Sequence, residues 1–302
     1  MYIKPVSLAV VLATSLSSFA MAQDGSVQKA SLVEDTGAQE RINFSGKLRM
    51  LSQRIASSAC HLAEGVDKEA TMAMLDASTK EFDKILAALE FGDESLNIMG
   101  AETRRKTIVK IDAVKEEWTP LRDAAISMAS GDISETNLNT ILEGNLSLLG
   151  AAVELVPAIV GQYSNPAEIV QANAVLLDIA GRQRMLTQRI SKEACMLNSG
   201  KANSEALEKM RKDIGIFEAS LNALRNGLPG AGIMAPPTAA IKAELEVVYN
   251  SWKSVKPEME KLLSGEKVTI EEETQKFNQL NVVMSEMNKV VGMYAKYAKN
   301  ET

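Results

Sequence analysis

Apolar residues recur along the chain at intervals of three and four, which is the period of an α-helix that buries one face. Phe44, Leu48, Leu51, Ile55 and Leu62, for example, fall on one side of a helical projection. No strand-like alternation persists for more than a few residues. Turn-forming residues divide the pattern into segments that we expect to be helices, at about 28–64, 68–91, 100–130, 133–163, 167–198, 202–226, 237–264 and 267–299. Because Pro166 directly follows Ser164 and Asn165, we expect the fourth helix to pass almost directly into the fifth.

The chain contains an internal repeat. The segment Gly46–Cys60 reads GKLRMLSQRIASSAC and the segment Gly181–Cys195 reads GRQRMLTQRISKEAC, with nine of these fifteen positions identical. The offset is 181 − 46 = 135, and Phe82 and Phe217 follow it. Short connections between long helices imply antiparallel neighbours. We therefore predict an all-α fold of two tandem four-helix bundles related by a pseudo-two-fold axis, at residues 23–165 and 166–302.

A second stripe on the first helix of each copy lies well away from the core face and is nearly the same in both copies. In the first copy it contains Gly46, Arg49, Gln53 and Cys60, and in the second Gly181, Arg184, Gln188 and Cys195. Small residues allow another backbone to approach, so we expect these two helices to face each other as equal patches do in a symmetric dimer. The alternative is that both copies retained the stripe by common descent.

Such a pairing brings Arg49 and Arg184 together. Two guanidinium groups about 7 Å apart repel by roughly 2 kcal/mol at an effective dielectric constant of about 20. A planar oxyanion between them would turn this repulsion into charge-assisted hydrogen bonds. The six polar and glycine residues of the two stripes are therefore our candidate ligand-binding residues. The alternative is that each arginine forms an ordinary salt bridge.

Further basic residues in the repeated segment are secondary candidates: Lys47, Arg54, Arg182 and Arg189. Arg54 and Arg189 lie about 140° around the helix from the first pair, and we expect them to form ion pairs within their bundles; the alternative is that they are charges at the rim of the site. Cys60 and Cys195 share the stripe with the arginines, which leaves open a disulfide or two buried thiols.

Composition narrows the class of protein. The net charge of −6 disfavours nucleic acid or an anionic membrane as the main partner. Residues 1–22 are typical of a cleaved signal peptide, with Lys4, an apolar stretch and a small-x-small cleavage site at Ala20–Ala22; the alternative is a retained anchor. We expect no other segment to be apolar enough to span a bilayer, and hence a soluble periplasmic protein.

Catalytic and metal-binding patterns are absent from the sequence. His61 is the sole histidine and is expected to be a packing or surface residue, and no Glu-x-x-His pair suggests a di-iron site. There is no nucleophile motif, phosphate loop or Cys-x-x-Cys pair. We therefore expect no enzymatic activity, no cofactor and no metal.

The segments INFSGKLRMLSQRI and LLDIAGRQRMLTQRI resemble the N-terminal sensor domain of type IV pili methyl-accepting chemotaxis transducers, the PilJ type. They are also similar to the P-box of nitrate/nitrite sensor kinases of the NarX type. The second resemblance implies a bundle that dimerises through its first helix and holds nitrate at the dyad. Its glycine and first arginine correspond here to Gly46 and Arg49 and to Gly181 and Arg184. Its second arginine corresponds to Arg54 and Arg189.

Three features depart from the NarX pattern. The P-box lysine two residues before the glycine is replaced by Phe44 and Ile179, no transmembrane helix follows the last bundle, and both modules lie in one chain. The resemblance implies a periplasmic protein that binds a nitrate- or nitrite-like anion and signals to a membrane-bound sensor or receptor, as a monomer with an internal pseudo-dimer or as a homodimer. The alternative is a ligand-free adaptor that docks on a chemoreceptor, pilus or kinase component. An enzyme or redox protein has the least support.

Overall fold

The computed structural model describes residues 37–163, 171–202 and 205–300. Within these ranges the chain forms helices and short turns, which confirms the all-α prediction and the two bundles. The first bundle contains α1 (Ala38–Ala63), α2 (Lys68–Phe91), α3 (Arg105–Ala129) and α4 (Glu135–Tyr163). The second contains α5 (Gln171–Asn198), α6 (Ala206–Asn226), α7 (Ala239–Leu263) and α8 (Ile270–Asn300). The signal peptide predicted at 1–22, the first residues of the first predicted helix and the boundary between the bundles at 165/166 lie outside the described residues.

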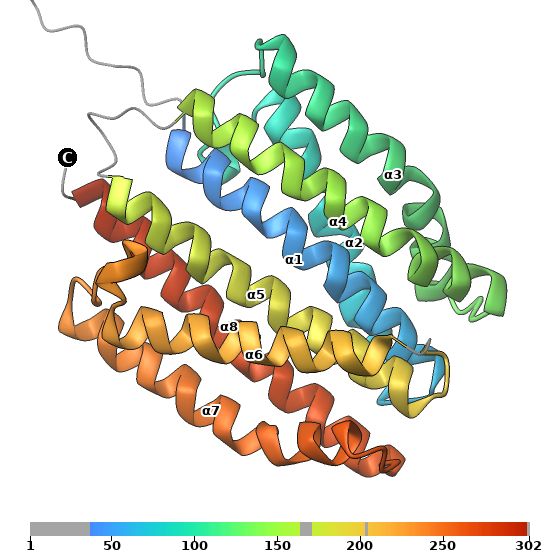
Figure 1. Cartoon of the computed structure of the whole chain (residues 1–302). Coiled ribbons are helices and arrows are strands. Elements are labelled where there is room, and N and C mark those ends of the chain that lie inside the picture. Colours follow the sequence, from blue (N-terminus) through green and yellow to red (C-terminus); the bar gives the residue numbers. More distant parts are fainter. Residues whose placement is uncertain (1–36, 164–170, 203–204, 301–302) are drawn as a thin grey trace, which may run out of the picture. The chain divides into compact units, whose positions relative to one another are not determined.

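Helices α1 and α5 lie side by side, with α2 to α4 on one side of the pair and α6 to α8 on the other (Figure 1). The same positions of the repeat meet at both ends of this contact. Cys60 and Cys195 form a disulfide with their Cα atoms 6.2 Å apart, and Gly46 and Gly181 both lie beside the guanidinium groups of Arg49 and Arg184. The two helices therefore run parallel in matching register, as a pseudo-two-fold axis requires.

The two bundles also repeat their internal packing. The rings of Phe82 and Trp118 lie 4.2 Å apart in the first bundle, and those of Phe217 and Trp252 lie 4.4 Å apart in the second. Each indole N–H donates to a carboxylate on the preceding helix, that of Asp83 at 2.7 Å in the first bundle and that of Glu218 at 2.9 Å in the second. A buried aromatic pair with a satisfied indole thus anchors the same place in each copy.

The turn after the second helix of each bundle explains a repeated glycine. Gly92 and Gly227 have φ of 84° and 77°, in the left-handed region that favours glycine. A Cβ on Gly92 would also lie 2.8 Å from the carbonyl oxygen of Gly100. Each turn continues into a short 3₁₀ segment, η1 (Glu94–Leu96) or η2 (Pro229–Ala231), so α3 and α7 begin a few residues later than predicted.

Helix α4 is more apolar than a solvent-facing bundle helix needs to be. By length and composition it could cross a membrane, with a mean hydropathy of 1.5, so the expectation that no segment beyond the N-terminal one is apolar enough was wrong. One face of α4 packs in the core along α1 and α3. Val153, by contrast, is 42% exposed. Core packing alone therefore does not account for the composition of this helix.

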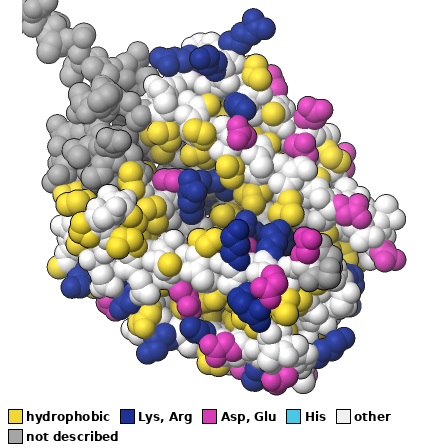
Figure 2. Space-filling view, in the orientation of Figure 1, with side chains coloured by type: hydrophobic (Ala, Val, Ile, Leu, Met, Phe, Trp, Pro, Cys, Tyr) yellow, Lys and Arg dark blue, Asp and Glu magenta, His cyan; other side chains and the backbone are white. Residues whose placement is uncertain are grey.

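Charged side chains of both signs are spread over the face shown in Figure 2, with hydrophobic side chains between them. This mixture agrees with the small net charge of −6 for a chain of 302 residues. Further polar side chains are buried inside the molecule, along the contact between the two bundles.

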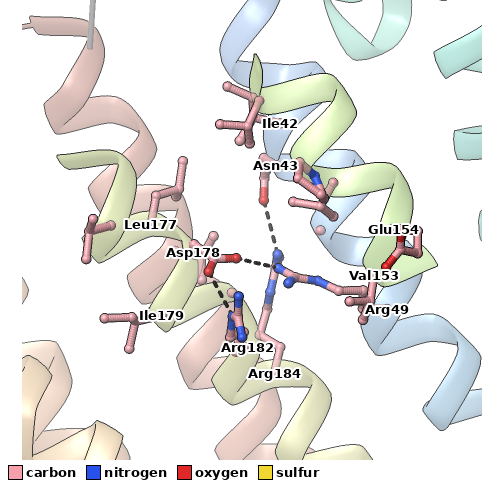
Figure 3. A pocket seen from close by; sticks show the side chains of 17 residues that line it. Ile42, Asn43, Arg49, Val153, Glu154, Leu177, Asp178, Ile179, Arg182 and Arg184 are labelled. Carbon is pink, nitrogen blue, oxygen red and sulfur yellow. Dashed lines mark hydrogen bonds and ion pairs between the residues drawn. The ribbon is translucent and has the colours of Figure 1, made fainter. Parts of the chain in front are cut away.

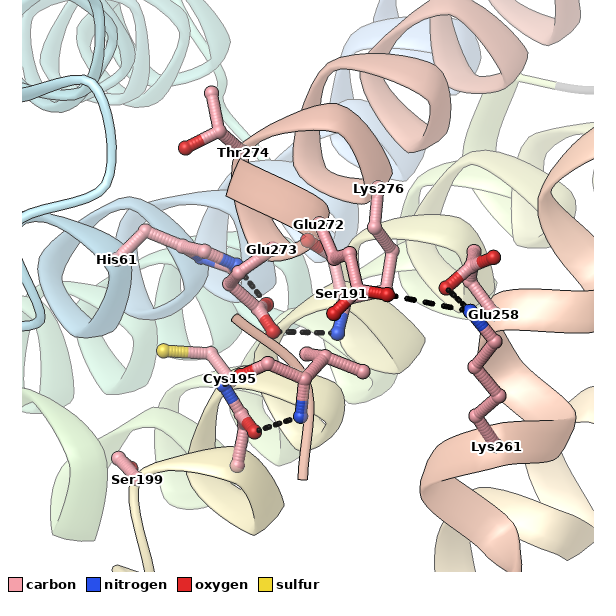
Figure 4. Close-up of polar contacts among 12 residues, drawn as sticks. His61, Ser191, Cys195, Ser199, Glu258, Lys261, Glu272, Glu273, Thr274 and Lys276 are labelled. Carbon is pink, nitrogen blue, oxygen red and sulfur yellow. Dashed lines mark hydrogen bonds and ion pairs between the residues drawn. The ribbon is translucent and has the colours of Figure 1, made fainter. Parts of the chain in front are cut away.

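A buried polar network closes that contact near the disulfide (Figure 4). The imidazole of His61 contacts the carbonyl oxygen of Ser57 at 2.7 Å and the carboxylate of Glu273 on α8 at 3.0 Å. Lys276 donates to the other oxygen of Glu273 at 2.5 Å. Burial acts to raise the pKa of Glu273, but the bond with His61 and the charge of Lys276 outweigh it and lower the pKa. His61 is a fully buried packing residue that links the bundles.

A second polar link joins α5 to the first bundle. The ammonium of Lys192 donates to the side-chain oxygens of Gln53 on α1, at 3.1 Å, and of Asn145 on α4, at 2.9 Å. Burial lowers the pKa of Lys192 to about 8. Both partners are neutral amides, so this cation is held by hydrogen bonds and not by an ion pair.

We expect the Glu193→Gln variant to lose a pH dependence that the natural protein has. Burial, and then the charge of Asp213, raise the pKa of Glu193 from 4.5 to about 7. The folded state therefore holds this proton more tightly than the unfolded state, and its stabilising effect is lost as pH rises through about 4.5 to 7. Between pH 5 and pH 7.5 the variant should gain about 1–3 kcal/mol in free energy of unfolding relative to the natural chain, measured by urea denaturation.

The matched control is Glu208→Gln on the exposed surface of α6, which should leave the pH dependence of the free energy of unfolding unchanged. Parallel pH profiles for Glu193→Gln and the natural chain would refute the assignment.

Candidate functional site

Two guanidinium groups meet between two glycines near the N-terminal end of the contact between α1 and α5 (Figure 3). A Cβ placed on Gly181 would lie 3.7 Å from Nη2 of Arg49 and 3.7 Å from Nη2 of Arg184. A Cβ on Gly46 would lie 3.3 Å and 3.9 Å from the same two atoms. The convergence of Arg49 and Arg184, predicted from the repeat, is therefore observed.

Each arginine reaches across the axis to the same position on the opposite helix. Arg49 donates from Nη2 to the carboxylate of Asp178 at 3.0 Å, and Arg184 donates from Nη2 to the amide oxygen of Asn43 at 3.2 Å. These acceptors are equivalent in the repeat, because 178 − 43 = 135. The two halves of the site thus share one geometry but differ by one negative charge.

Arg184 is a buried cation whose hydrogen bonds, among the described residues, go to neutral amides. Its second bond, from Nη1, goes to the amide oxygen of Asn288 on α8 at 2.8 Å. No carboxylate in the part of the chain that the structure describes lies within ion-pair distance of it. The side chain is 1% exposed, and burial followed by the charge of Arg49 lowers its pKa to about 10. Burying a charge without a partner is costly, so this position favours an anion.

Arg49 is better compensated, although not fully. Burial lowers its pKa, and Asp178 acts in the opposite direction. That carboxylate is shared, because Arg182 donates to its other oxygen from Nε at 2.8 Å. The Nε atoms of both Arg49 and Arg184 have no hydrogen-bond partner among the described residues. Donors therefore remain available at both guanidinium groups.

A cavity of about 490 Å³ opens beside the two arginines. Its polar lining residues are Asn43, Arg49, Glu154, Asp178, Arg182 and Arg184. Its apolar lining comes mainly from α4 and α5, namely Val153, Val156, Pro157 and Val160 with Val175, Leu177 and Ile179, and is completed by Ile42 and Val291. The backbones of Gly46 and Gly181 complete the wall. Glu154 forms an ion pair with Lys110 at 3.2 Å, which leaves the arginine end of the cavity with a positive excess.

The two candidate glutamines lie on the helix contact but do not line this cavity. Gln53 is bound by Lys192, and Gln188 donates to the amide oxygen of Asn281 on α8 at 3.3 Å. They lie one helical turn beyond the arginines, toward the disulfide. Gln53 thus links the two bundles through Lys192, whereas the bond of Gln188 lies within the second bundle.

The secondary candidates separate into different roles. Arg182 lines the cavity, whereas Lys47 forms an ion pair with Glu81, and Arg189 pairs with Asp213 inside its own bundle. The prediction that Arg54 forms an ion pair within its own bundle was wrong. Its Nη2 donates instead to Asn281 of the second bundle at 3.4 Å, because position 54 lies beside α8.

Sequence reasoning missed the polar partners of the arginines. Asn43 and Asp178 differ between the copies, so a search for identical stripes passed over them. A signal was available, since each lies three residues before the glycine and hence on the same helix face. The apolar wall of α4 left a weaker signal, the high hydropathy of that helix.

We expect Gly181→Ala to raise stability and weaken anion binding at the same time. An added methyl would make only ordinary van der Waals contacts with the two guanidinium groups, and alanine favours a helix over glycine by about 1 kcal/mol. The same methyl fills the space that an anion between the guanidiniums would use. Thermal unfolding should occur at a higher temperature, and calorimetric titration should show about tenfold weaker binding, equivalent to 1.4 kcal/mol.

Gly150→Ala on α4 is the control, because a Cβ there meets nothing within 4 Å. It should raise stability without affecting binding. Equal effects of both variants on binding would remove the glycine from the site.

Comparison with known protein families supplies the remaining evidence. The chain matches the family described as "Type IV pili methyl-accepting chemotaxis transducer N-term", PilJ, over residues 32–143 and 169–277. It is 24% identical over 229 residues to "Protein PilJ" of Pseudomonas aeruginosa, which covers 74% of this chain and 32% of that protein. It is 23% identical over 232 residues to "Putative methyl-accepting chemotaxis AlkN" of Alcanivorax borkumensis, which covers 76% of this chain and 30% of that protein. The chain thus spans about a third of the length of these relatives.

The two matched segments fall on the two bundles and include both copies of the repeated motif, as the resemblance in sequence led us to expect. The chain therefore belongs to the PilJ family of chemotaxis-transducer sensory domains and carries the domain twice.

Proposed function

We propose that this protein is a periplasmic sensor that binds a small anion between α1 and α5 and signals to a membrane-bound receptor or sensor protein. The observation that carries the proposal is Arg184, a fully buried guanidinium that lies beside a second guanidinium and is hydrogen-bonded, among the described residues, to neutral amides. A planar oxyanion could accept hydrogen bonds from both groups and cancel their repulsion. By resemblance to the NarX type, nitrate and nitrite are the first ions to test.

The disulfide supports the proposed location. A bond between Cys60 and Cys195 suits an oxidising compartment such as the periplasm. It also suits a monomer in which the two bundles form an internal pseudo-dimer, because it joins them in one chain. The two positions of α1 and α5 that a ligand would bridge then lie on one covalently fixed pair of helices.

Ligand binding has a direct route to a conformational signal. An anion that binds both arginines competes with Asn43 and Asp178 for the same Nη2 atoms. Those contacts cross between the bundles, so their replacement changes how α1 and α5 hold each other. A partner that contacts the bundles could detect such a change.

The test is isothermal titration calorimetry of the protein with nitrate, nitrite and acetate. We expect saturable binding that weakens in the Arg49→Met and Arg184→Met variants. Failure of every anion to bind, or binding unaffected by both substitutions together, would overturn the proposal.

The Asp178→Asn variant distinguishes the sensor from a ligand-free adaptor. The ion pair between Arg49 and Asp178 favours the adaptor, since it satisfies one arginine without a ligand. If the site binds an anion, this carboxylate is an internal competitor, and Asp178→Asn should tighten binding by about tenfold, or 1.4 kcal/mol. The reverse substitution at the equivalent position, Asn43→Asp, should weaken it. An adaptor would show only altered stability in both variants.

A further inference from the structure

The cavity beside the arginines is much larger than an inorganic oxyanion. Its volume of about 490 Å³ is roughly sixteen times the ~30 Å³ that one water molecule occupies in the liquid. It falls in the range of pockets that hold organic ligands, about 300–1,000 Å³. Nitrate has four heavy atoms and would leave most of this space filled with water against aliphatic walls.

The polar and apolar parts of the cavity are separated. Figure 3 shows the guanidinium groups converging with Asn43 and Asp178, while the aliphatic side chains of Ile42, Leu177 and Ile179 lie above and to the left of that group. The α4 side is also apolar, with Val153, Val156, Pro157 and Val160 along one stretch of the helix. A ligand that fits both parts carries one charged end and one hydrocarbon body.

The repeat shows that the apolar wall is particular to one side of the site. On α8, the amide oxygen of Asn288 accepts a hydrogen bond from Nη1 of Arg184. The equivalent position on α4 is 288 − 135 = 153, which is Val153. Farther along, Gly292 and Ala295 of α8 correspond to Pro157 and Val160 of α4, so the α4 face has the larger aliphatic groups at these positions, while Val156 and Val291 are the same. This difference explains why α4 is so apolar although part of it is exposed.

The charge count favours a single carboxylate. Among the described residues that line the cavity, the two buried guanidinium groups of Arg49 and Arg184 face one carboxylate, that of Asp178, which leaves one positive charge. Arg182 is 59% exposed and therefore screened by solvent, and Glu154 is paired with Lys110. A carboxylate presents two oxygens to the planar fork of a guanidinium.

We infer that the ligand of this site is an aliphatic monocarboxylate, with its carboxylate on Arg184 and Arg49 and its hydrocarbon body along the valines of α4 and the facing side chains of α5. This inference rests on the proposed anion site and specifies the class of anion that it takes. The charged end supplies the counter-ion that Arg184 lacks, and the body excludes water from the aliphatic wall.

The test is calorimetric titration with acetate, butyrate, hexanoate and octanoate, with nitrate and hexanol for comparison. Each buried methylene should tighten binding about threefold to fourfold until the cavity is full. Hexanoate should bind more tightly than nitrate, and hexanol should bind weakly because it cannot neutralise Arg184.

Variants of the wall separate this inference from the proposed function. Val153→Asn places on α4 the amide that α8 has at position 288, at a side chain exposed enough to accept it. Because the new amide lies near Arg49, the measured quantity is the difference between ligands: hexanoate should weaken at least threefold more than acetate or nitrate. Val247→Asn, at a similarly exposed valine of α7 outside the cavity, is the control and should change nothing.

The outcomes are distinguishable. If inorganic anions bind and chain length has no effect, the aliphatic body is refuted while the anion site stands. If hexanol binds as tightly as hexanoate, and the Arg49→Met and Arg184→Met variants bind both compounds as well as the natural chain does, anion recognition itself is refuted. If no compound binds, both proposals fail.

Discussion

Replacement of Arg184 by methionine should weaken anion binding by about 10- to 100-fold and should not destabilise the protein. Charge-assisted hydrogen bonds contribute about 1.5–3 kcal/mol each, and Arg184 is the group whose charge is otherwise uncompensated. The side chain is almost fully buried beside a second cation. A methionine of similar length removes the desolvated charge, so we expect the free energy of unfolding to stay the same or to rise by about 1 kcal/mol. Calorimetric titration and urea denaturation measure the two effects.

Two further variants frame this result. Arg49→Met should weaken binding as well, but it leaves Asp178 with only Arg182 as a partner, so stability should fall slightly. Arg211→Met, at an exposed arginine of α6, should change neither property. If Arg184→Met unfolds at much lower urea concentration, the guanidinium is a structural group and not part of an anion site.

Removal of the disulfide by Cys60→Ser and Cys195→Ser together should lower the free energy of unfolding by about 3–5 kcal/mol. The bond closes a loop with a sequence separation of 135, so it restricts the unfolded chain strongly. The disulfide also joins the two bundles beside the contact between His61 of α1 and Glu273 of α8, which depends on the two bundles staying together. Urea denaturation of the double variant and of the natural chain under reducing conditions should give the same lowered midpoint.

A reducing agent should have no further effect on the double variant, which serves as its own control. Anion affinity should change less than stability, because the arginines lie about eleven residues, or roughly 16 Å, along the helix from the cysteines. An unchanged unfolding midpoint in the variant would show that packing alone joins the bundles.

Periodicity and the repeat predicted most of the fold. The helix ranges agree with the structure to within a few residues wherever it describes them, because long amphipathic segments and glycine breaks specify helices locally. The convergence of Arg49 and Arg184 followed from position, since residues at equal places on paired helices must approach each other near the axis. Arg54 was misplaced because a residue on the flank of α1 can reach either bundle, and only the packing of α8 decides which.

The cavity could not be predicted in the same way. A valine that lines a pocket and a valine that packs in a core look the same in a sequence, so the role of α4 emerged only when its position beside α5 was known. The polar partners were missed for a related reason. Asn43 and Asp178 carry the difference between the two halves, whereas a comparison of repeats selects what the halves share.

The difference between the two halves of the site has a consequence for the orientation of a bound ligand. A dimer of identical subunits must present the same residues twice, so a lopsided ligand can enter in either of two equivalent poses. Here the halves are encoded separately, and evolution can change one without the other, as with Asp178 opposite Asn43 and Val153 opposite Asn288. Fusion of two domains in one chain thus allows an asymmetric ligand to bind in a single orientation, so that its effect on the first bundle can differ from its effect on the second.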